Sequence, residues 1–301
     1  MQHNPPVVER NDAAVATLAA DATCQEIKET FVRHGFVVLR RFLSGEALAE
    51  VQREASRAAA ELPGKIPPEH VMFDDAEHPS TLKQIQQLWR HDAYFGTLMR
   101  RLQATAEAAL GEACTAQNMQ YFNKPARSAY AGSRCCSGSR PTPPHQDGYY
   151  FMLAPPWAAC TMWLALDPAD EANGCLRYVM GSAADASAPR PHGFSGVLGF
   201  SQELRDFGPA DEAREVAMRA EPGDLLVHSA LLIHRADANS SAERPRRALG
   251  AIFYTASAVV DQEAYEARQL DIRRRAAELP GQNLASVGLR EAPHSVAASV
   301  T

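Results

Sequence analysis

Apolar residues recur at helical spacing through the first third of the chain. Thr23 followed by Glu26 has the form of a capping box at the start of such a pattern, which predicts a helix beginning there. Further helices are predicted after Ser44 and over residues 92–110, where apolar positions again recur every three or four residues. Between the first two helices, the compact apolar run of residues 36–39 predicts one buried strand.

From about residue 116 onward, the pattern changes to short runs in which side chains alternate between two faces. A period of two is typical of strands, because successive side chains point to opposite faces of a sheet. Strands are predicted over residues 82–86, 117–122, 158–167, 176–179, 214–218, 224–228 and 248–255. Helical pattern is nearly absent between residues 147 and 254, and it returns past residue 260. Many short strands separated by Gly, Pro and Asn turns predict a β-sandwich or a barrel.

These patterns divide the chain into one folded domain with looser ends. Residues 1–22 are predicted to form a flexible N-terminal arm, and residues 281–301 a weakly patterned tail. The domain between them, residues 23–280, comprises a helical part (about 23–115), a β core (about 116–256) and a C-terminal helix (about 260–280). Since no internal repeat is present, the strands are expected to build one core.

Net charge and composition exclude several classes of partner. The chain of 301 residues has a formal net charge of −6 and a pI near 5.9, which argues against nucleic acid as a main partner. It contains no apolar run of about 18 residues that would span a membrane. The first residues lack the basic start and apolar stretch of a signal peptide, so a cytoplasmic protein is expected. Because the six cysteines form no CxxC pair, reduced thiols and no structural zinc site are expected.

His145 and Asp147 lie two residues apart, directly after a segment rich in Gly, Ser, Arg and Pro. On an extended strand both side chains would leave the same face and could hold one metal ion. Two imidazoles and one carboxylate form the ligand set of non-heme Fe(II) sites that keep one face open. A third ligand would come from another histidine, and only His228 and His234 lie in an apolar stretch. The preceding segment, residues 125–144, is expected to form a mobile loop over the site rather than a core element.

Arginines near position 246 indicate a second part of the site. A guanidinium can bind a carboxylate through two parallel hydrogen bonds. Arg244 is expected in a solvated turn, whereas Arg246 shares a strand face with small residues such as Gly250, which leave space for a ligand. Gln84 and Gln120 stand in strand-like runs among large apolar neighbours, where they could line a pocket or face water at a strand edge.

Several short motifs together resemble one known family. In chain order they are GFVVL (35–39), QYFNKP (120–125), HQD (145–147), WLALD (163–167), NGCL (173–176), GS (181–182), PGD (222–224) and, after His234, PRRA (245–248). Their order and their spread over roughly residues 28–256 are far more specific than any one motif. The sequence thus resembles the phytanoyl-CoA dioxygenase (PhyH) family of Fe(II)- and 2-oxoglutarate-dependent oxygenases.

The resemblance implies a mainly β fold with flanking helices, whose core is a double-stranded β-helix, a cupin-like jelly-roll. It also implies that His145, Asp147 and His234 hold the iron at the open mouth of this core. His228 matches no ligand position of the family and is expected to be structural.

For the co-substrate, the resemblance implies that Arg246 binds the far carboxylate of 2-oxoglutarate. The residues implied to line the same pocket are Gln120, Trp163 and Gln84. One residue is added between the distal histidine and this arginine, so Arg247 stays an alternative to Arg246. Many relatives have a small Gly-Ser pair after the distal histidine, where this chain has Arg235 and Ala236. The change removes a possible hydroxyl contact to the co-substrate.

The implied reaction is hydroxylation of an unactivated C–H bond of a small molecule, or its desaturation or cyclisation. It would consume O2 and 2-oxoglutarate and release succinate and CO2. The implied substrate is a secondary metabolite, an amino-acid derivative or an acyl thioester. The expected state is a monomer or homodimer with no nucleic-acid or membrane partner. The alternative is a non-catalytic or metal-dependent hydrolytic relative on the same barrel.

Overall fold

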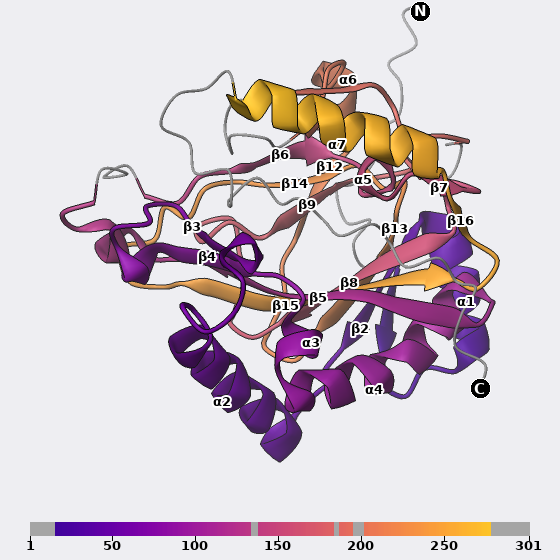
Figure 1. Ribbon diagram of the computed structural model, residues 1–301. Helices are drawn as coiled ribbons and strands as arrows, with labels where there is room; N and C mark the ends of the chain where they lie inside the picture. The colour runs from indigo at the N-terminus through magenta and orange to yellow at the C-terminus, as the bar shows by residue number, and fades with distance from the viewer. Residues whose placement is uncertain (1–15, 134–137, 184–186, 195–201, 278–301) are drawn as a thin grey trace, which may run out of the picture.

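Two β-sheets stacked face to face form the centre of the computed structural model, which describes residues 16–133, 138–183, 187–194 and 202–277 (Figure 1). The main sheet has eight strands, in the order β1 (Thr17–Ala19), β2 (Phe36–Arg40), β13 (Leu225–Ser229), β8 (Ala159–Ala165), β15 (Arg246–Thr255), β5 (Cys114–Lys124), β4 (Leu82–Ile85) and β3 (Val71–Phe73). The second sheet has four, in the order β12 (Glu215–Met218), β9 (Leu176–Val179), β14 (His234–Ala236) and β6 (Thr142–His145). Such stacked sheets are the arrangement that the short-strand pattern predicts.

Helices cover the outer face of the main sheet. They are α1 (Cys24–His34), α2 (Gly45–Glu61), α3 (Leu88–His91) and α4 (Ala93–Leu110), and α2, α3 and α4 lie below the sheet in Figure 1. Ala55 of α2 and Leu102 of α4 belong to the same buried core as Met162 of β8. Since helices cover one face and the second sheet the other, β8 is buried at all seven of its positions.

A second apolar layer lies between the two sheets. Trp163 and Ala248 of the main sheet pack there with Tyr178 and Leu232 from the side of the second sheet. Strand alternation explains the division, because Met162 faces the helices and its neighbour Trp163 faces inward. The inward-facing positions of the main sheet therefore determine what lines the space between the sheets.

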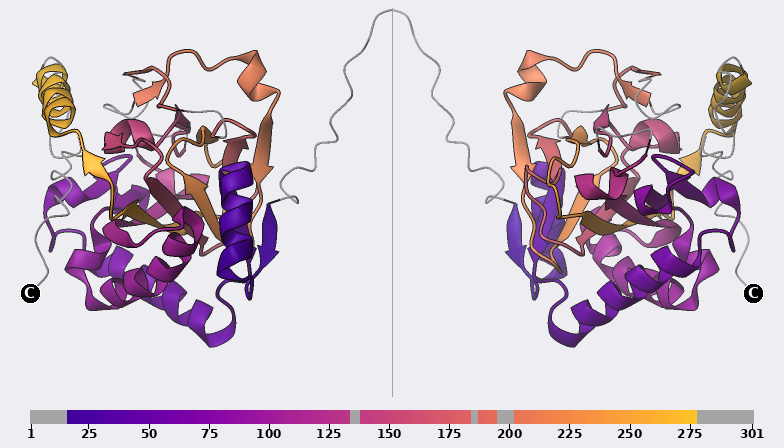
Figure 2. Two further views of the ribbon diagram at one scale, coloured as in Figure 1. Left: turned by 90° about the vertical axis from the view of Figure 1, so that its right-hand side faces the viewer. Right: turned by 90° about the vertical axis from the view of Figure 1, so that its left-hand side faces the viewer.

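The remaining elements surround the second sheet. They are the ladders β10 (His192–Phe194) with β11 (Gln202–Leu204) and β7 (Leu153–Ala154) with β16 (Val259–Val260), the helices α5 (Gly148–Phe151), α6 (Pro209–Glu212) and α7 (Gln262–Ala277), and the 3-10 turns η2 (Pro68–His70), η3 (Pro79–Thr81) and η4 (Arg127–Tyr130). Figure 2 shows α7 at one edge of this layer and β12 with α6 at the other. Among the described residues, no helix is both long and apolar enough to cross a membrane.

Most of the predicted helices and strands are present, with ends within three residues of those expected. The capping box is also present, because Thr23 accepts a hydrogen bond from the Glu26 backbone while the Glu26 carboxylate accepts one from the Thr23 backbone. Ser44 stands at the N-cap of α2 as predicted, but its side chain makes no capping hydrogen bond. Strand β15 begins two residues earlier than predicted, which places Arg246 and Arg247 in the sheet.

The structure differs from the expectations in two places. Residues 17–19, assigned to the flexible arm, form β1 and pair in parallel with β2. Strands β6 and β14 were not predicted, since β14 has only three residues and β6 contains Pro143 and Pro144. Proline is tolerated in β6 because this strand lies at the edge of its sheet, where an N–H is not needed for pairing. The near absence of helix expected between residues 147 and 254 agrees with the described residues there, which form only two one-turn helices, α5 and α6.

The segment 125–144, expected to be a mobile loop, is anchored by several buried residues among those that the structure describes, although others in it are exposed. Tyr130 is buried and donates a hydrogen bond to Asp74, and the Ser139 hydroxyl accepts one from the backbone of Asn239. These contacts tie the segment to parts of the chain that are distant in sequence. Residues 134–137, with the pair Cys135–Cys136, lie outside the described residues, as do 1–15 and 278–301.

Candidate metal centre

Two short strands of the second sheet bring a pair of histidines together. His145 ends β6, His234 begins β14, and the two residues are directly paired across these strands. Their ring centroids lie 4.1 Å apart. Asp147 follows two residues after His145, and one potential ligand atom from each of the three residues lies within 4.8 Å of the others. The three residues that the sequence singles out thus form one cluster.

Asp147 reaches this cluster from a turn and not from a strand. Its backbone angles, φ −60° and ψ −34°, are helical, and it stands at the N-cap of α5. The expectation that residues 145 and 147 share one face of an extended strand is therefore wrong. The turn is anchored by the backbone N–H of Gly148, which donates to the Ala230 carbonyl at 2.7 Å.

Both imidazoles present an unprotonated nitrogen to the centre of the cluster. Nδ1 of His145 lies 2.8 Å from the Pro143 carbonyl oxygen, and Nδ1 of His234 lies 3.0 Å from the Leu232 carbonyl oxygen. A carbonyl oxygen can only accept, so each Nδ1 carries the proton in the neutral ring. Each Nε2 then keeps its lone pair, as a metal ligand must.

The two oxygens of the Asp147 carboxylate have different surroundings. Oδ2 accepts a hydrogen bond from the Thr161 hydroxyl at 2.6 Å and lies 3.3 Å from Nε2 of His228. Oδ1 lies 3.6 Å from Nε2 of His145 and 4.0 Å from Nε2 of His234. Oδ1 is therefore the oxygen that faces both imidazoles and is left to bind an ion.

The protonation states of the cluster suit a cation. Burial lowers the pKa of His234 to about 4, so its ring is neutral at physiological pH. Burial alone would raise the pKa of Asp147, but the imidazoles of His234, His228 and His145 outweigh this and hold that pKa well below its usual range. A neutral imidazole and an ionised carboxylate are the forms that bind a metal ion.

The donor set fits one divalent metal ion. Ligand atoms at about 2.1 Å in adjacent positions around an ion lie about 3 Å apart. The observed separations of 3.6 and 4.0 Å come close to this value, and small side-chain rotations would close the difference. Two histidines and one carboxylate suit non-heme Fe(II) with open positions, whereas a structural zinc site would need a fourth protein ligand.

His228, the other histidine of the apolar stretch, contacts Oδ2 of the Asp147 carboxylate. An ionised carboxylate only accepts, so Nε2 of His228 donates to Asp147 and its Nδ1 accepts from the Tyr178 hydroxyl at 2.8 Å. All three side chains of this chain of hydrogen bonds lie between the sheets. His228 is thus placed to orient the carboxylate, and it stands outside the three-residue cluster.

A buried arginine without an acidic partner lies in the same space between the sheets. Arg246 is 4% exposed, donates from Nε to the Gly174 carbonyl at 3.1 Å and stacks over the Trp163 ring at 5.4 Å. Among the residues that the structure describes, no carboxylate forms an ion pair with it. Burial lowers the pKa of Arg246 to about 10. A buried cation with unused donors and no counter-charge is suited to an anionic ligand.

Arg247, the alternative, faces the other way. Its guanidinium makes two hydrogen bonds, of 2.7 and 2.9 Å, with the Asp167 carboxylate on the helix side of the sheet. Its charge is therefore already compensated. The small residue Gly250, expected to leave space for a ligand, does not do so, because a Cβ there would lie 2.4 Å from the Phe122 ring.

Further polar groups lie beside Arg246. Gln84 donates to Gln120 at 2.8 Å, so these two glutamines pair on the inner face of the main sheet and do not stand alone at a strand edge. Lys124 is directly paired with Arg246 across the sheet, and its ammonium donates to the Arg140 carbonyl at 2.9 Å. Burial, together with the nearby Arg246, lowers the pKa of Lys124 well below its usual value. Two buried basic side chains, Lys124 and Arg246, therefore lie side by side here.

Comparison with known proteins gives the family. The sequence matches the phytanoyl-CoA dioxygenase (PhyH) family over residues 31–248, which is most of the chain. The chain belongs to the phytanoyl-CoA dioxygenase family. It is 33% identical over 99 residues to a probable phytanoyl-CoA dioxygenase of Caenorhabditis elegans, and 30% identical over 102 residues to phytanoyl-CoA dioxygenase domain-containing protein 1 of Danio rerio. These alignments cover 32% and 33% of this chain, and only 31% and 34% of the relatives' own length.

Solved structures similar to this PhyH chain show the same fold. The epimerase SnoN from nogalamycin biosynthesis has a TM-score of 0.63 at 21% identity, with 92% of this chain and 95% of SnoN covered. EctD from S. alaskensis has a TM-score of 0.61 at 18% identity, with 79% of each chain covered. The carbocyclase SnoK has a TM-score of 0.59 at 19% identity, with 84% of this chain and 93% of SnoK covered. The predicted cupin-like fold, mainly β with flanking helices, is thereby confirmed.

Two residues of this PhyH site, Thr161 and Tyr178, could not be recognised from the sequence. Thr161 and Tyr178 hold Asp147 and His228, but each stands in a predicted strand where a polar or aromatic residue is ordinary. Strand parity could have shown that Thr161 and Trp163 share the inward face, since they are two residues apart. Nothing local could have shown that Tyr178 lies against His228, because the two come from different sheets.

Proposed function

We propose that this chain is a non-heme Fe(II)- and 2-oxoglutarate-dependent dioxygenase. The observation that carries the proposal is the convergence of two imidazole Nε2 atoms and one free carboxylate oxygen within 4.8 Å. His145, Asp147 and His234 would hold the iron on one side of its coordination sphere. The other side would stay open for the co-substrate and for O2.

The second element of the proposal is a site for 2-oxoglutarate. This co-substrate is a dicarboxylate, so one carboxylate can bind the iron while the other needs a cation at a distance. Arg246 is suited to that task because it is buried, has donors to spare and has no described acidic partner. Trp163, Gln120 and Gln84 would line the pocket, and Lys124 lies beside Arg246.

Iron, 2-oxoglutarate and O2 together supply the oxidant that hydroxylates, desaturates or cyclises an unactivated C–H bond, with release of succinate and CO2. The chain's own residues orient the reactants and limit access of water. Thr161 and His228 hold one oxygen of the Asp147 carboxylate, which would leave the other oxygen to bind iron. The apolar layer around Trp163 and Tyr178 excludes water from the inner end of the site.

A small molecule with an apolar part is the proposed substrate. Tyr150 contacts His145 edge to face at 5.9 Å, so aromatic side chains border the metal site. The net charge of −6 supports a small molecule over nucleic acid. Related structures are described with nogalamycin RO or 5-hydroxyectoine bound, which supports a secondary metabolite or an amino-acid derivative, with an acyl thioester as a further candidate. We also propose that the protein acts in the cytoplasm as a monomer or homodimer.

The proposal can be tested with anaerobically purified protein. Addition of Fe(II) followed by 2-oxoglutarate should produce the visible charge-transfer absorption of the bound complex, and admission of O2 should release succinate. The double variant His145→Ala/Asp147→Ala serves as the control and should show neither signal. Absence of Fe(II)-dependent 2-oxoglutarate binding in the wild-type protein would refute the proposal. Binding without any succinate release, even with candidate substrates, would favour a non-catalytic relative.

A further inference from the structure

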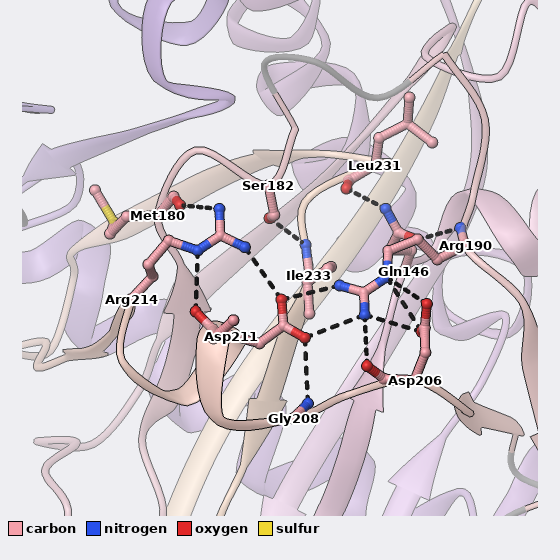
Figure 3. A network of polar contacts seen from close by, with 11 residues as sticks. Gln146, Met180, Ser182, Arg190, Asp206, Gly208, Asp211, Arg214, Leu231 and Ile233 are labelled. Atoms are coloured by element: carbon pink, nitrogen blue, oxygen red, sulfur yellow. Dashed lines mark hydrogen bonds and ion pairs between the residues drawn. The ribbon is translucent and has the colours of Figure 1, made fainter.

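Gln146, the residue between two of the proposed ligands, is completely buried although it is polar. Its side chain bridges two other segments of the chain (Figure 3). Nε2 donates to the Leu231 carbonyl at 2.6 Å, and Oε1 accepts from the Arg190 backbone N–H at 2.7 Å. Because a carbonyl only accepts and an N–H only donates, these partners fix which end of the carboxamide faces which segment. The carboxamide supplies this donor and this acceptor without carrying a charge.

The bridge connects the two segments that carry the histidines. Leu231 lies three residues before His234, in a turn that makes further hydrogen bonds. The Ile233 N–H donates to the Ser182 hydroxyl at 2.9 Å, and the Ile233 carbonyl accepts from the Val179 N–H. Strands β6 and β14 themselves are joined by only two directly paired positions, with an irregularity between them. Gln146 therefore adds a connection where the backbone ladder is short.

Arg190 is itself held by a network of charges in which Asp211 is buried and Asp206 and Arg214 are exposed (Figure 3). Its guanidinium binds Asp211 at 2.9 Å and also Asp206 at 2.9 Å. Asp211 is buried and also accepts from Arg214, which donates to the Met180 carbonyl. Met180 lies two residues before Ser182, so the network returns to the turn that carries His234. These hydrogen bonds and ion pairs therefore connect the segment that carries His145 to the segment that carries His234.

A second contact joins Gln146 to the segment that carries Arg190. Its backbone N–H donates to Nε2 of His192 at 3.1 Å, and the His192 ring stacks on Tyr149 at 4.2 Å. The segment of Arg190 and His192 therefore forms hydrogen bonds with both the side chain and the backbone of Gln146. None of these groups belongs to the three-residue cluster.

We infer that Gln146 is a positioning residue, whose carboxamide sets the spacing between the His145–Asp147 turn and the His234 segment with the support of Arg190. The inference rests on the proposed metal site. Its physical basis is that ligands already held at the right separation bind an ion without further ordering of the chain, and residues that orient ligands typically contribute 10- to 100-fold in affinity. Methionine at 146 keeps the shape and removes both hydrogen bonds, and an ionised glutamate removes the donor toward Leu231.

Titration of the intact apo-protein with Co(II), followed by its visible absorption, tests this inference. Gln146→Met and Gln146→Glu should raise the Kd for Co(II) by about 10- to 100-fold and change the Co(II) spectrum. Arg190→Lys should shift the Kd in the same direction by less. The matched control is Arg219→Lys, because Arg219 also makes two bonds to a carboxylate, that of Glu171, but lies outside the network. The control should bind Co(II) as the wild type does.

Melting of each apo-variant separates positioning from general loss of stability. A variant that melts lower but binds Co(II) with unchanged Kd and spectrum would overturn the inference. If Gln146→Met does not fold, the comparison of Arg190→Lys with Arg219→Lys decides, and equal affinities would overturn it. Wild-type protein that binds no Co(II) would instead refute the proposed function, so the two failures are distinguishable.

Discussion

At the scale of single residues, the two oxygens of the Asp147 carboxylate have different contacts, and these contacts set the geometry of the site. One oxygen is held by the Thr161 hydroxyl and lies beside His228, and the other faces His145 and His234. A carboxylate held in this way cannot easily bind an ion through both oxygens, so one coordination position is kept open. The chemistry of an open site thus depends on residues that never contact the metal.

His228 should therefore affect metal affinity without being a ligand. We expect His228→Ala to retain one bound Fe(II) per chain with a Kd raised by about tenfold, since Thr161 still holds the carboxylate. We expect His234→Ala to lose the ion. Elemental analysis after anaerobic loading measures the stoichiometry of both variants. Loss of iron in the first variant with retention in the second would show that His228 is the third ligand.

The two neighbouring arginines should differ in their effect on the co-substrate. Removal of a buried charge from its ligand costs about 2 kcal/mol or more, so Arg246→Ala should raise the KM for 2-oxoglutarate by about 30-fold or more. Arg247→Ala removes an ion pair with Asp167 on the other face and should leave this KM nearly unchanged. Succinate release at varied 2-oxoglutarate concentration measures both. The reverse order would move the carboxylate site to Arg247.

At the scale of elements, local signals fix where the helices begin, and packing fixes where they lie. Helix α1 begins at a reciprocal pair of hydrogen bonds between Thr23 and Glu26, and it ends at Gly35, whose φ of 75° favours glycine. Its residues Ile27 and Phe31 join the core below the main sheet. Strands β6 and β14 have no comparable local signal, and they exist because the second sheet pairs them.

The capping box of α1 gives a stability prediction with an internal control. Thr23→Ala removes the oxygen that accepts from the Glu26 N–H, and we expect it to lower the free energy of unfolding by about 1 kcal/mol. Ser44→Ala at the start of α2 should cost less, because the Ser44 side chain makes no capping bond. Urea denaturation of both variants measures the difference. Equal losses of unfolding free energy in the two variants would mean that the hydrogen bond from Glu26 to the Thr23 hydroxyl does not stabilise the helix.

At the scale of the whole molecule, the proposed site joins the two sheets. His145 and His234 come from the second sheet, whereas Asp147 is held by Thr161 of β8 and His228 of β13 in the main sheet. An ion bound by all three residues would therefore link both layers. Ligands that bind only the folded state stabilise it by mass action.

Metal and co-substrate should accordingly raise the melting temperature together. With each ligand at about 100 times its Kd, the expected stabilisation is about 2.7 kcal/mol per ligand. We expect Co(II) to raise the Tm, 2-oxoglutarate to raise it further only when Co(II) is present, and a chelator to reverse both shifts. Calorimetry under nitrogen measures them, with Asp147→Ala as the control. An equal rise with 2-oxoglutarate in the absence of metal would contradict a site shared by the two ligands.

Much of the fold and part of the site could be predicted from the sequence. Periodicity and caps predicted the longer helices and the longer strands to within three residues, because both depend on neighbouring positions. The same local reasoning failed for Pro143 and Pro144, where an edge position overrides a strong signal against strand. Local reasoning also placed Asp147 on an extended strand. A one-turn helix such as α5 is too short to show a periodic pattern in the sequence.

The sequence by itself determined which chemical groups are available: a His-x-Asp pair, two histidines in one apolar stretch and a pair of adjacent arginines. Only the tertiary structure decided which histidine lies beside His145 and which arginine is buried with no acidic partner among the described residues. It also decided that Gln146 points away from the proposed metal site and bridges two distant segments. The physical reason is that these placements depend on pairing between strands far apart in the chain, whereas composition and periodicity report only what each segment can do locally.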